Sequence, residues 1–169
     1  MHQRAVAPTL TTERLTLRPQ RRSDFDLLVQ LYTSDRSRFV GGRRTASAVW
    51  RDFMNSVGHW PITGMGGWAI DITVTGQCIG EVAVCRPPEY PEIEIGWVLF
   101  EGNEGRGYAP EAATAARNWA RDTLCATSLV SYIDPDNAPS LKLARRLGGK
   151  PDGTAATPNG DACLVFRYW

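Results

Sequence analysis

The pattern of hydrophobic and polar positions begins with the period of a strand and then changes to that of a helix. Residues 15–17 alternate apolar and polar side chains, which predicts a first strand, and the apolar spacing over residues 25–32 predicts a first helix. Ser23, with Asp26 three residues later, forms an acidic variant of a capping box at the start of that helix. The chain therefore enters its fold as a strand followed by a helix.

Glycine and proline then divide the chain into further elements. Residues 45–57 have helical spacing and predict a second helix, whereas the glycine- and proline-containing residues 58–67 predict a loop. The remaining pattern predicts strands at residues 68–72, 78–85, 92–99, 128–133 and 163–168, and helices that begin after residue 107 and at residue 137.

Two of these elements have well-defined faces. In the strand over residues 92–99, one face holds Ile93, Ile95, Trp97 and Leu99 and the other holds Glu92, Glu94, Gly96 and Val98. The helix that follows has a stripe at helical spacing formed by Ala112, Ala116, Trp119 and Ala120. Strands joined first by turns and later through helices predict an α/β fold in one domain over residues 1–169, with a mixed sheet covered by helices on both faces.

A glycine-rich turn lies between the strand over residues 92–99 and the alanine-rich helix. Gly105 and Gly107 can adopt backbone angles that are closed to other residues, and the first turn of a helix offers N–H groups without partners. Pro110 fits a first helical turn because it has no N–H to lose. This arrangement predicts a phosphate-binding loop.

The spacing of this loop, G-x-x-G-x-G, narrows the class of phosphate ligand. The segment lacks the Gly-Lys-Ser/Thr sequence with which a nucleotide-hydrolysing loop reaches terminal phosphates and magnesium. It also differs from G-x-G-x-x-G and follows a later strand than the first, which argues against a dinucleotide-binding βαβ opening. A glycine-rich turn alone is weak support, because glycine also marks turns for conformational reasons.

Length, composition and charge exclude several classes of protein. The 169 residues are 43% hydrophobic, which suits one globular domain with its own core, and 19 basic against 18 acidic residues leave no broad field to attract nucleic acid or a membrane surface. The sequence shows no signal peptide pattern and no apolar run near the ~20 residues of a membrane span. A soluble, cytoplasmic protein without nucleic-acid or membrane partners is expected.

The cysteines and histidines do not predict a metal site. Four scattered cysteines lack C-x-x-C spacing and, with only His2 and His59 beside them, make no zinc-binding set: Cys78, Cys85, Cys125 and Cys163. We interpret them as buried, reduced thiols. A nucleophilic cysteine paired with His59 is the alternative, and no sequence feature supports it.

Several sequence blocks, in this order and spacing, carry a family resemblance. They are Thr12-Glu13-Arg14-Leu15-Thr16-Leu17-Arg18, Glu94-Ile95-Gly96-Trp97, Gly105-Arg106-Gly107-Tyr108-Ala109-Pro110-Glu111-Ala112, Asn137-Ala138-Pro139-Ser140-Leu141-Lys142-Leu143 and Leu147-Gly148-Gly149. Together they resemble the GCN5-related N-acetyltransferase (GNAT) superfamily, and most closely its ribosomal-protein alanine acetyltransferase branch. The resemblance implies the acyl-CoA N-acyltransferase fold, with a mixed, mostly antiparallel central sheet.

The resemblance also implies how acetyl-coenzyme A is bound. The superfamily binds the pyrophosphate through backbone amides of [QR]-x-x-G-x-[GA], so the expected cofactor-binding residues are Val98, Leu99, Gly102, Gly105, Arg106, Gly107, Tyr108, Ala109, Asn137 and Ser140. This chain has Gly102 where the family has Arg or Gln, so one side-chain contact is missing or supplied elsewhere. Lys142, Arg145 and Arg146 either meet the other phosphates or form a solvated helix face.

Glu94 is the candidate general base. It lies in the middle of a strand beside the loop, where a carboxylate is expensive to bury unless it lines a cleft. A partly desolvated carboxylate has a raised pKa and can accept a proton from an ammonium substrate, directly or through water. The alternative is a solvated or ion-paired side chain, and Glu92 on the same face is the second candidate base.

The remaining catalytic tasks are assigned less specifically. The resemblance implies that a backbone N–H of Val98 or Leu99 polarises the thioester oxygen, and that Asn137 and Ser140 face the pantetheine and the departing sulfur. Ser140 is the candidate acid, although its segment is also an ordinary turn and helix-cap sequence. Many relatives use a tyrosine instead, and residues 137–147 contain none.

The acceptor pocket is expected around the second helix and the loop after it. The aromatic and sulfur-containing residues there are Trp50, Phe53, His59, Trp60, Met65 and Trp68, and about half of them are expected to be core. His59, Trp60, Trp68 and Glu94 are the candidate substrate-binding residues.

Together these features predict an enzyme that transfers acetyl from acetyl-CoA directly to a primary amine, without a covalent enzyme intermediate or a metal. The resemblance implies a protein N-terminal α-amine as acceptor, and aminoglycosides, polyamines and amino acids are the small-molecule alternatives. The rival interpretation is a non-catalytic acyl-CoA-binding sensor. Whether the protein is a homodimer is left open by the sequence.

Overall fold

One mixed sheet of eight strands runs through the molecule. In the computed structural model, which describes residues 6–169, the strands lie in the order β1-β2-β3-β4-β5-β6-β8-β7. They are β1 (Leu10–Thr11), β2 (Leu15–Pro19), β3 (Gly66–Ile72), β4 (Cys78–Cys85), β5 (Glu94–Leu99), β6 (Val130–Ile133), β7 (Lys150–Pro151) and β8 (Leu164–Arg167). Every pair of neighbours is antiparallel except β5 and β6, which confirms the mixed, mostly antiparallel sheet.

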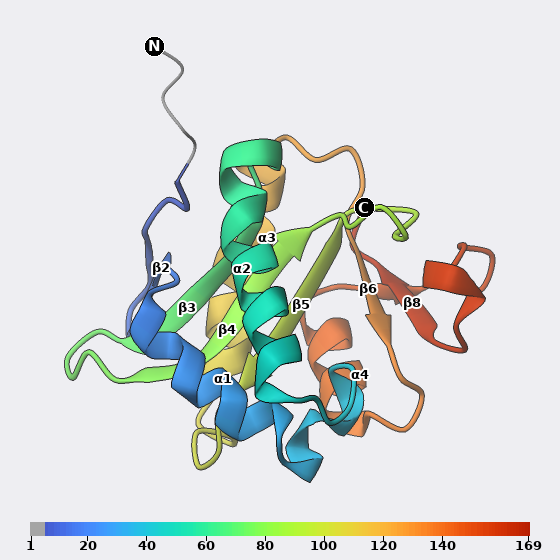
Figure 1. The fold of residues 1–169 in the computed structure, drawn as a ribbon. Coiled ribbons are helices and arrows are strands. Elements are labelled where there is room, and N and C mark those ends of the chain that lie inside the picture. Colours follow the sequence, from blue (N-terminus) through green and yellow to red (C-terminus); the bar gives the residue numbers. More distant parts are fainter. Residues whose placement is uncertain (1–5) are drawn as a thin grey trace.

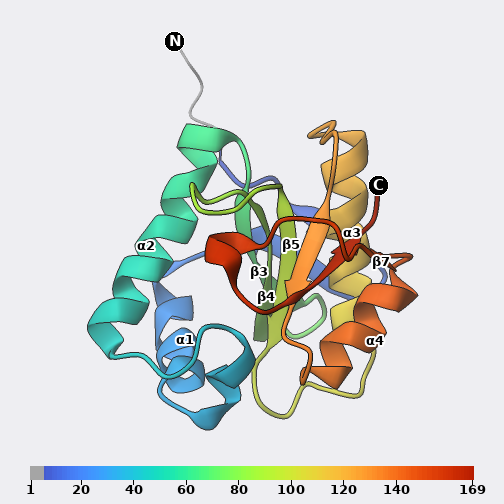
Figure 2. The ribbon, with the colours of Figure 1, turned by 90° about the vertical axis from the view of Figure 1, so that its right-hand side faces the viewer.

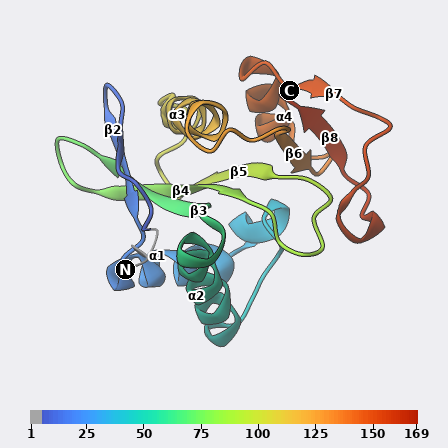
Figure 3. The ribbon, with the colours of Figure 1, turned by 90° about the horizontal axis from the view of Figure 1, so that it is seen from above.

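Two pairs of helices enclose this sheet (Figure 1). The helices are α1 (Phe25–Tyr32), α2 (Ala46–Thr63), α3 (Tyr108–Asp122) and α4 (Ala138–Arg146), and the short 3₁₀ turns are η1 (Arg22–Asp24), η2 (Asp35–Phe39) and η3 (Pro158–Gly160). Seen from above, α1 and α2 lie on one face of the sheet and α3 and α4 on the other (Figure 3). The predicted two-sided covering is therefore confirmed.

Strand alternation sorts side chains between the two faces. Val82 and Val84 of β4 are fully buried in the same cluster as the α3 alanines, which confirms the predicted stripe of Ala112, Ala116, Trp119 and Ala120. Alanine on that stripe lets the helix approach the sheet closely. On the opposite face of β4, Glu81, Ala83 and Cys85 turn toward α2, where the cavity described below opens.

The second helix is longer than predicted. α2 continues through residues that we expected to form a loop and ends only at Gly64, whose φ of +73° places it in the left-handed region typical of a helix C-cap. Pro61 lies inside the helix, where it removes one backbone hydrogen bond. Trp60 offsets this, since it is 5% exposed and its indole N–H donates to the Gly67 carbonyl at 2.9 Å. Tertiary packing thus overrides the helix-breaking tendency of Gly58 and Pro61.

The start of α1 also differs from the predicted capping box. The carboxylate of Asp24, in place of the predicted Ser23 and Asp26 pair, accepts the backbone N–H of Arg21 at 2.7 Å. Asp24 is buried because Arg18 reaches it with two hydrogen bonds of 2.8 and 2.9 Å and also pairs with Asp71 at 2.6 Å. None of the helices in the described part of the chain has the length and apolarity needed to cross a bilayer.

Candidate active site

The two parallel strands β5 and β6 meet at one end and then diverge (Figure 1). The view turned by 90° shows them at the centre of the molecule, with α2 to one side and α3 and α4 to the other (Figure 2). Their pairing is confined to Glu94 and Val130, with the Val130 N–H donating to the Ile93 carbonyl at 3.0 Å. A cavity of about 460 Å³ opens beside this gap, with walls from α2, β3, β4, β5, β6 and the start of α4. Such a break in a sheet leaves backbone groups available to a ligand.

Alternation along β5 decides which backbone N–H groups face the gap. Phe100 donates its N–H to Ile79 of the antiparallel neighbour at 2.8 Å, so Val98, two residues earlier, also points toward β4. Trp97 and Leu99 point the other way, in keeping with the Leu99 carbonyl, which accepts from Arg36 Nη2 at 3.3 Å. Of the two predicted amide donors, Leu99 faces the gap and Val98 does not.

Glu94 has the environment of a general base. Its side chain lines the cavity, and burial raises its pKa to about 7, although the Tyr132 backbone amide acts in the opposite direction. A carboxyl group with this pKa is about half ionised at neutral pH and can accept a proton.

Glu92, the second candidate base, is instead part of an ion pair. Arg167 donates to both of its carboxylate oxygens at 2.7 and 2.8 Å, and this hydrogen bonding holds the pKa of Glu92 below its usual value. The alternative weighed for Glu94, an ion-paired side chain, thus applies to Glu92. It does not line the cavity.

The glycine-rich loop has the backbone geometry that was predicted. Gly102, Gly105 and Gly107 have φ angles of +80°, +75° and +80°, and the positions where a Cβ would lie on Gly102 and Gly105 are open. α3 begins directly after Gly107, and no side chain of residues 6–169 caps its first turn. Its first N–H groups therefore remain available to an anion.

Arg14 holds this loop against the edge of the sheet and was missed as a site residue. Its Nη1 donates to the Arg106 carbonyl at 3.0 Å, its Nε donates to Glu111 at 2.7 Å, and its guanidinium lies 4.9 Å from the centre of the Tyr108 ring. Arg14 belongs to a sequence block that carries the family resemblance, and this membership could have marked it as a site residue.

The start of α4 forms the opposite wall of the gap. Asn137 and Ser140 both line the cavity, and the Asn137 side chain accepts the Ser140 backbone N–H at 3.3 Å. Asn137 therefore caps α4 and also faces the cavity. Lys142, Arg145 and Arg146 are exposed and outside the cavity lining, as expected for a solvated helix face.

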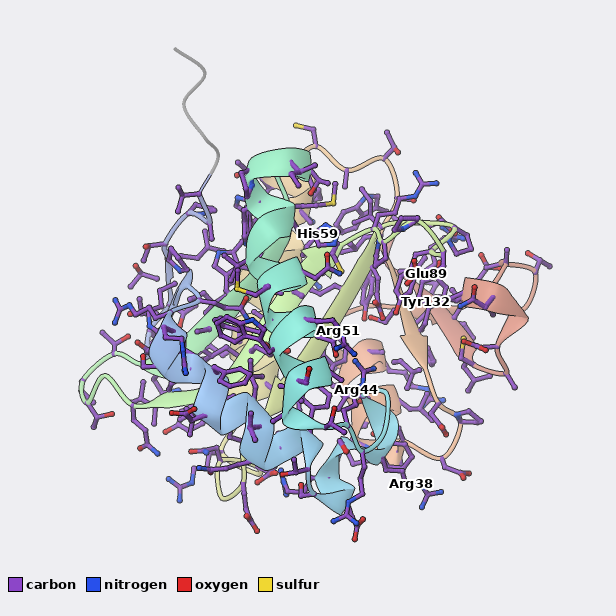
Figure 4. All side chains as sticks on the ribbon, viewed as in Figure 1. Arg38, Arg44, Arg51, His59, Glu89 and Tyr132 are labelled. Atoms are coloured by element: carbon purple, nitrogen blue, oxygen red, sulfur yellow. The ribbon has the colours of Figure 1, made fainter. Side chains whose placement is uncertain are left out.

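The predicted acceptor residues separate into two groups. His59 lines the cavity from α2, and in Figure 4 it lies on the same side of the gap as Arg44, with Tyr132 across from them on β6. Trp60, Trp68 and Trp119 pack against one another at centroid distances of 4.7 to 5.5 Å, and Trp60 and Trp68 are 5% and 0% exposed. Because these two indoles fill the core and are absent from the cavity lining, we assign them a packing role.

Sequence reasoning also missed a second cavity carboxylate, Glu81 on β4. Burial raises its pKa to about 7, as for Glu94, and Gln20 Nε2 donates to it at 2.9 Å. The signal was present, since a glutamate in the middle of an apolar strand is the feature that pointed to Glu94.

The cysteines are free but not deeply buried. Cys125 is exposed and the other three are partly buried, so the prediction of buried thiols is wrong for Cys125 and too strong for the rest. Burial raises the pKa of Cys85, which lies in the cavity, to about 12, so its thiol is protonated at neutral pH. Within residues 6–169 no cluster of His, Cys, Asp and Glu is arranged to hold a metal, and His2 lies outside these residues.

Comparison with known proteins agrees with this arrangement. The family model described as Acetyltransferase (GNAT) domain matches residues 14–150. An acetyltransferase from Agrobacterium tumefaciens is 44% identical in sequence, with a TM-score of 0.92 over 96% of this chain and 95% of that one. The uncharacterized N-acetyltransferase p20 of Bacillus licheniformis is 27% identical over 149 residues, which is 86% of this chain and 84% of that protein.

A more distant solved structure shares the fold. It is a ribosomal L7/L12 α-N-protein acetyltransferase in complex with coenzyme A, 19% identical, with a TM-score of 0.71 over 95% of this chain and 96% of that one. The family match covers most of the chain, and the cavity, the glycine-rich loop and the parted strands lie within it. The chain therefore belongs to the GNAT family of acetyltransferases.

Proposed function

We propose that this protein transfers the acetyl group of acetyl-CoA directly to a primary amine held in the cavity, with Glu94 as the general base. The observation that carries this proposal is the position of Glu94 at the point where β5 and β6 part, within the cavity and close in sequence to the glycine-rich loop. The base, the gap and the anion-binding turn are then parts of one site.

The residues present suit acetyl-CoA, which would supply the activated acetyl thioester. Gly102 and Gly105 leave the main chain open to a diphosphate, and the first turn of α3 offers N–H donors to it. The gap between β5 and β6 suits an extended arm that reaches the cavity. Arg106 within the loop adds a positive charge beside the diphosphate.

Glu94 prepares the acceptor for attack. An amine at neutral pH is largely an ammonium ion, which has no lone pair to donate. The Glu94 carboxylate takes one proton from the nitrogen, directly or through a water molecule, and the nitrogen lone pair forms the new bond to the acetyl carbon. The bond between that carbon and the thioester sulfur then breaks, and the second proton that the nitrogen loses neutralises the departing thiolate. Holding acceptor and acetyl group side by side lowers the barrier further, because the reaction becomes effectively unimolecular.

Groups on both walls of the gap can stabilise the negative charges that develop on the acetyl oxygen and on the departing sulfur. The N–H groups of Trp97 and Leu99 face the gap and are suited to stabilise a negative oxygen on the acetyl carbon. Ser140 lies on the opposite wall, where its hydroxyl can donate a hydrogen bond to the departing thiolate. This assigns the leaving-group role to Ser140, which lies at the start of α4 beside its N-cap, Asn137.

The proposal is tested with Glu94→Gln, which preserves shape and removes the ionisable group. We expect turnover to fall about 100-fold or more, the usual contribution of general base catalysis, in an assay of thiol release over peptides, aminoglycosides, polyamines and amino acids. Calorimetry should show unchanged acetyl-CoA affinity. Glu89→Gln, in the exposed connection between β4 and β5, is the matched control.

Two results would contradict the proposal. Retained turnover in Glu94→Gln would exclude this base, and the absence of any heat of coenzyme A binding would remove the cofactor assignment. If the wild-type protein binds acetyl-CoA but releases no thiol with any amine, the chain is an acyl-CoA sensor.

A further inference from the structure

A row of small residues crosses the floor of the cavity between two carboxylates. Gly67 of β3, Ala83 of β4 and Gly96 of β5 are paired in register, so their Cα atoms lie side by side across three strands. Along the strands, Glu81 lies two paired positions to one side of this row, and Glu94 lies two paired positions to the other. Because Glu81 and the partner of Glu94 are four residues apart on β4, the two glutamates are separated by roughly 14 Å along the strands.

Among the described residues, no cation acts as a charge partner of Glu81. Burial raises its pKa, and a hydrogen bond from Gln20 and repulsion from Asp24 are the other influences on it. Arg44, the one arginine among the lining residues of the range 6–169, is occupied by an ion pair with Asp52 and lies over the Tyr32 ring. Asp24, by contrast, has Arg18 as its partner. A partly buried carboxylate without a cation is a binding group for one.

Further acceptor atoms gather around Glu81. The Gln20 amide that donates to Glu81 has its oxygen buried, with no hydrogen-bond partner in the described part of the chain. Ser56 of α2 lines the cavity nearby, and its Oγ would lie only 2.6 Å from a Cβ placed on Gly67. The Gln20 amide lies 3.6 Å from the same position. A primary ammonium group has three donors and no acceptor, so a carboxylate with an amide oxygen and a hydroxyl suits it.

The charge of the whole cavity agrees with a cationic ligand. In the described lining, the acidic residues are Asp52, Glu81, Glu94 and Asp134, whereas the basic side chains are Arg44 and the imidazole of His59. An acidic cavity attracts cations and disfavours an acceptor that carries a carboxylate near its amine.

We propose that the acceptor is a linear diamine or polyamine, whose reacting amine lies at Glu94 and whose second ammonium group binds Glu81. The methylene chain crosses Ala83 and Gly96, where the lack of larger side chains leaves room for it. This assignment rests on the proposed function, since it identifies the acceptor for the same site. Glu81 is then the residue that selects the acceptor.

The experiment compares amines that differ in their second charge. The probes are spermidine and putrescine, with octylamine and butylamine as monoamines, in an assay of thiol release from acetyl-CoA. We expect spermidine to have the highest kcat/KM, because only this longer polyamine reaches both carboxylates. In Glu81→Gln the kcat/KM for spermidine should fall about 10- to 100-fold, the range for a hydrogen bond to a charged group, with butylamine unchanged.

Two variants complete the design. Glu81→Asp keeps the charge on a shorter side chain and should restore part of the spermidine activity, whereas Glu89→Gln removes one exposed negative charge outside the cavity lining and should change nothing. Thermal unfolding and coenzyme A titration of each variant confirm that the fold and the cofactor site are intact.

The outcomes separate this assignment from the proposed function. Equal loss for spermidine and butylamine in Glu81→Gln would overturn the selective role and point to Glu81 as a base. A preference of the wild type for N-terminal peptides over every amine would overturn the acceptor class while leaving acetyl transfer in place. Loss of all turnover in Glu94→Gln alone tests the base and does not decide the acceptor.

Discussion

Glu94→Gln should make the protein more stable at neutral pH while it abolishes catalysis. Burial raises the pKa of Glu94 from 4.5 to about 7, so the folded state holds a proton that the unfolded chain has released. Stability changes with pH in proportion to protons bound by the unfolded state minus those bound by the folded state. For Glu94 this difference is negative between pH 4.5 and 7, so stability falls as the pH rises through that window.

The magnitude follows from the same shift. A difference of about 2.5 pKa units, at 1.36 kcal/mol each, gives a penalty of about 3 kcal/mol above pH 7. Because the side chain is partly open to the cavity, water reduces this figure, and we expect 1 to 3 kcal/mol as an order of magnitude. Glutamine has no such charge to bury, so the variant escapes the penalty.

The assay is urea unfolding at a series of pH values from 5 to 8. At pH 5 both proteins hold a neutral side chain at position 94 and should differ little, whereas at pH 8 the variant should be the more stable. Glu89→Gln should follow the wild type throughout. A stability difference that does not change with pH would show that Glu94 is not buried in the way described, and a variant that is less stable at pH 8 would refute the reasoning.

Two further predictions concern the loop and the core. Arg14→Ala removes the support of the Arg106 carbonyl and the ion pair with Glu111, so the coenzyme A Kd measured by calorimetry should rise about 10-fold. Because the Arg14 side chain is 44% exposed, the free energy of unfolding should fall by less than about 1 kcal/mol. An unchanged Kd would show that the loop keeps its shape without Arg14. Trp60→Ala leaves a cavity between two other tryptophans and should lower the free energy of unfolding by about 3 to 5 kcal/mol. The relative kcat/KM values for different amines should stay the same, whereas a change in them would show that Trp60 contacts the acceptor directly.

Local pattern was enough to predict most of the sheet. The alternation around Glu94, the alanine stripe of α3 and the glycines of the loop each follow from the preferences of a few adjacent residues, and each has the predicted form. The length of α2 could not be predicted in this way. Its second half is held by the hydrogen bond of Trp60 to Gly67 and by the packing of Trp60 on Trp119, and Trp119 is far away in the sequence.

The candidate site could be predicted only where its residues belong to local sequence motifs. Glu94, Asn137 and Ser140 lie in motifs, whereas Glu81 and Gln20 meet only because β2 and β4 both pair with β3. The choice between Val98 and Leu99 depends on which residues of β5 form backbone hydrogen bonds with β4. The type of side chain at a position does not indicate the direction in which its backbone N–H points. Trp60 and Trp68 have the composition of a binding pocket, and only the fold shows that they face inward.

The parting of β5 from β6 has a consequence for how this protein can evolve. Its donors at the gap belong to the main chain, so replacing Trp97 or Leu99 by another residue of similar volume leaves the donors in place. Selection at this point preserves a spacing between two strands, and many different sequences can maintain that spacing. Lineages can therefore diverge widely at these positions while the underlying chemistry persists.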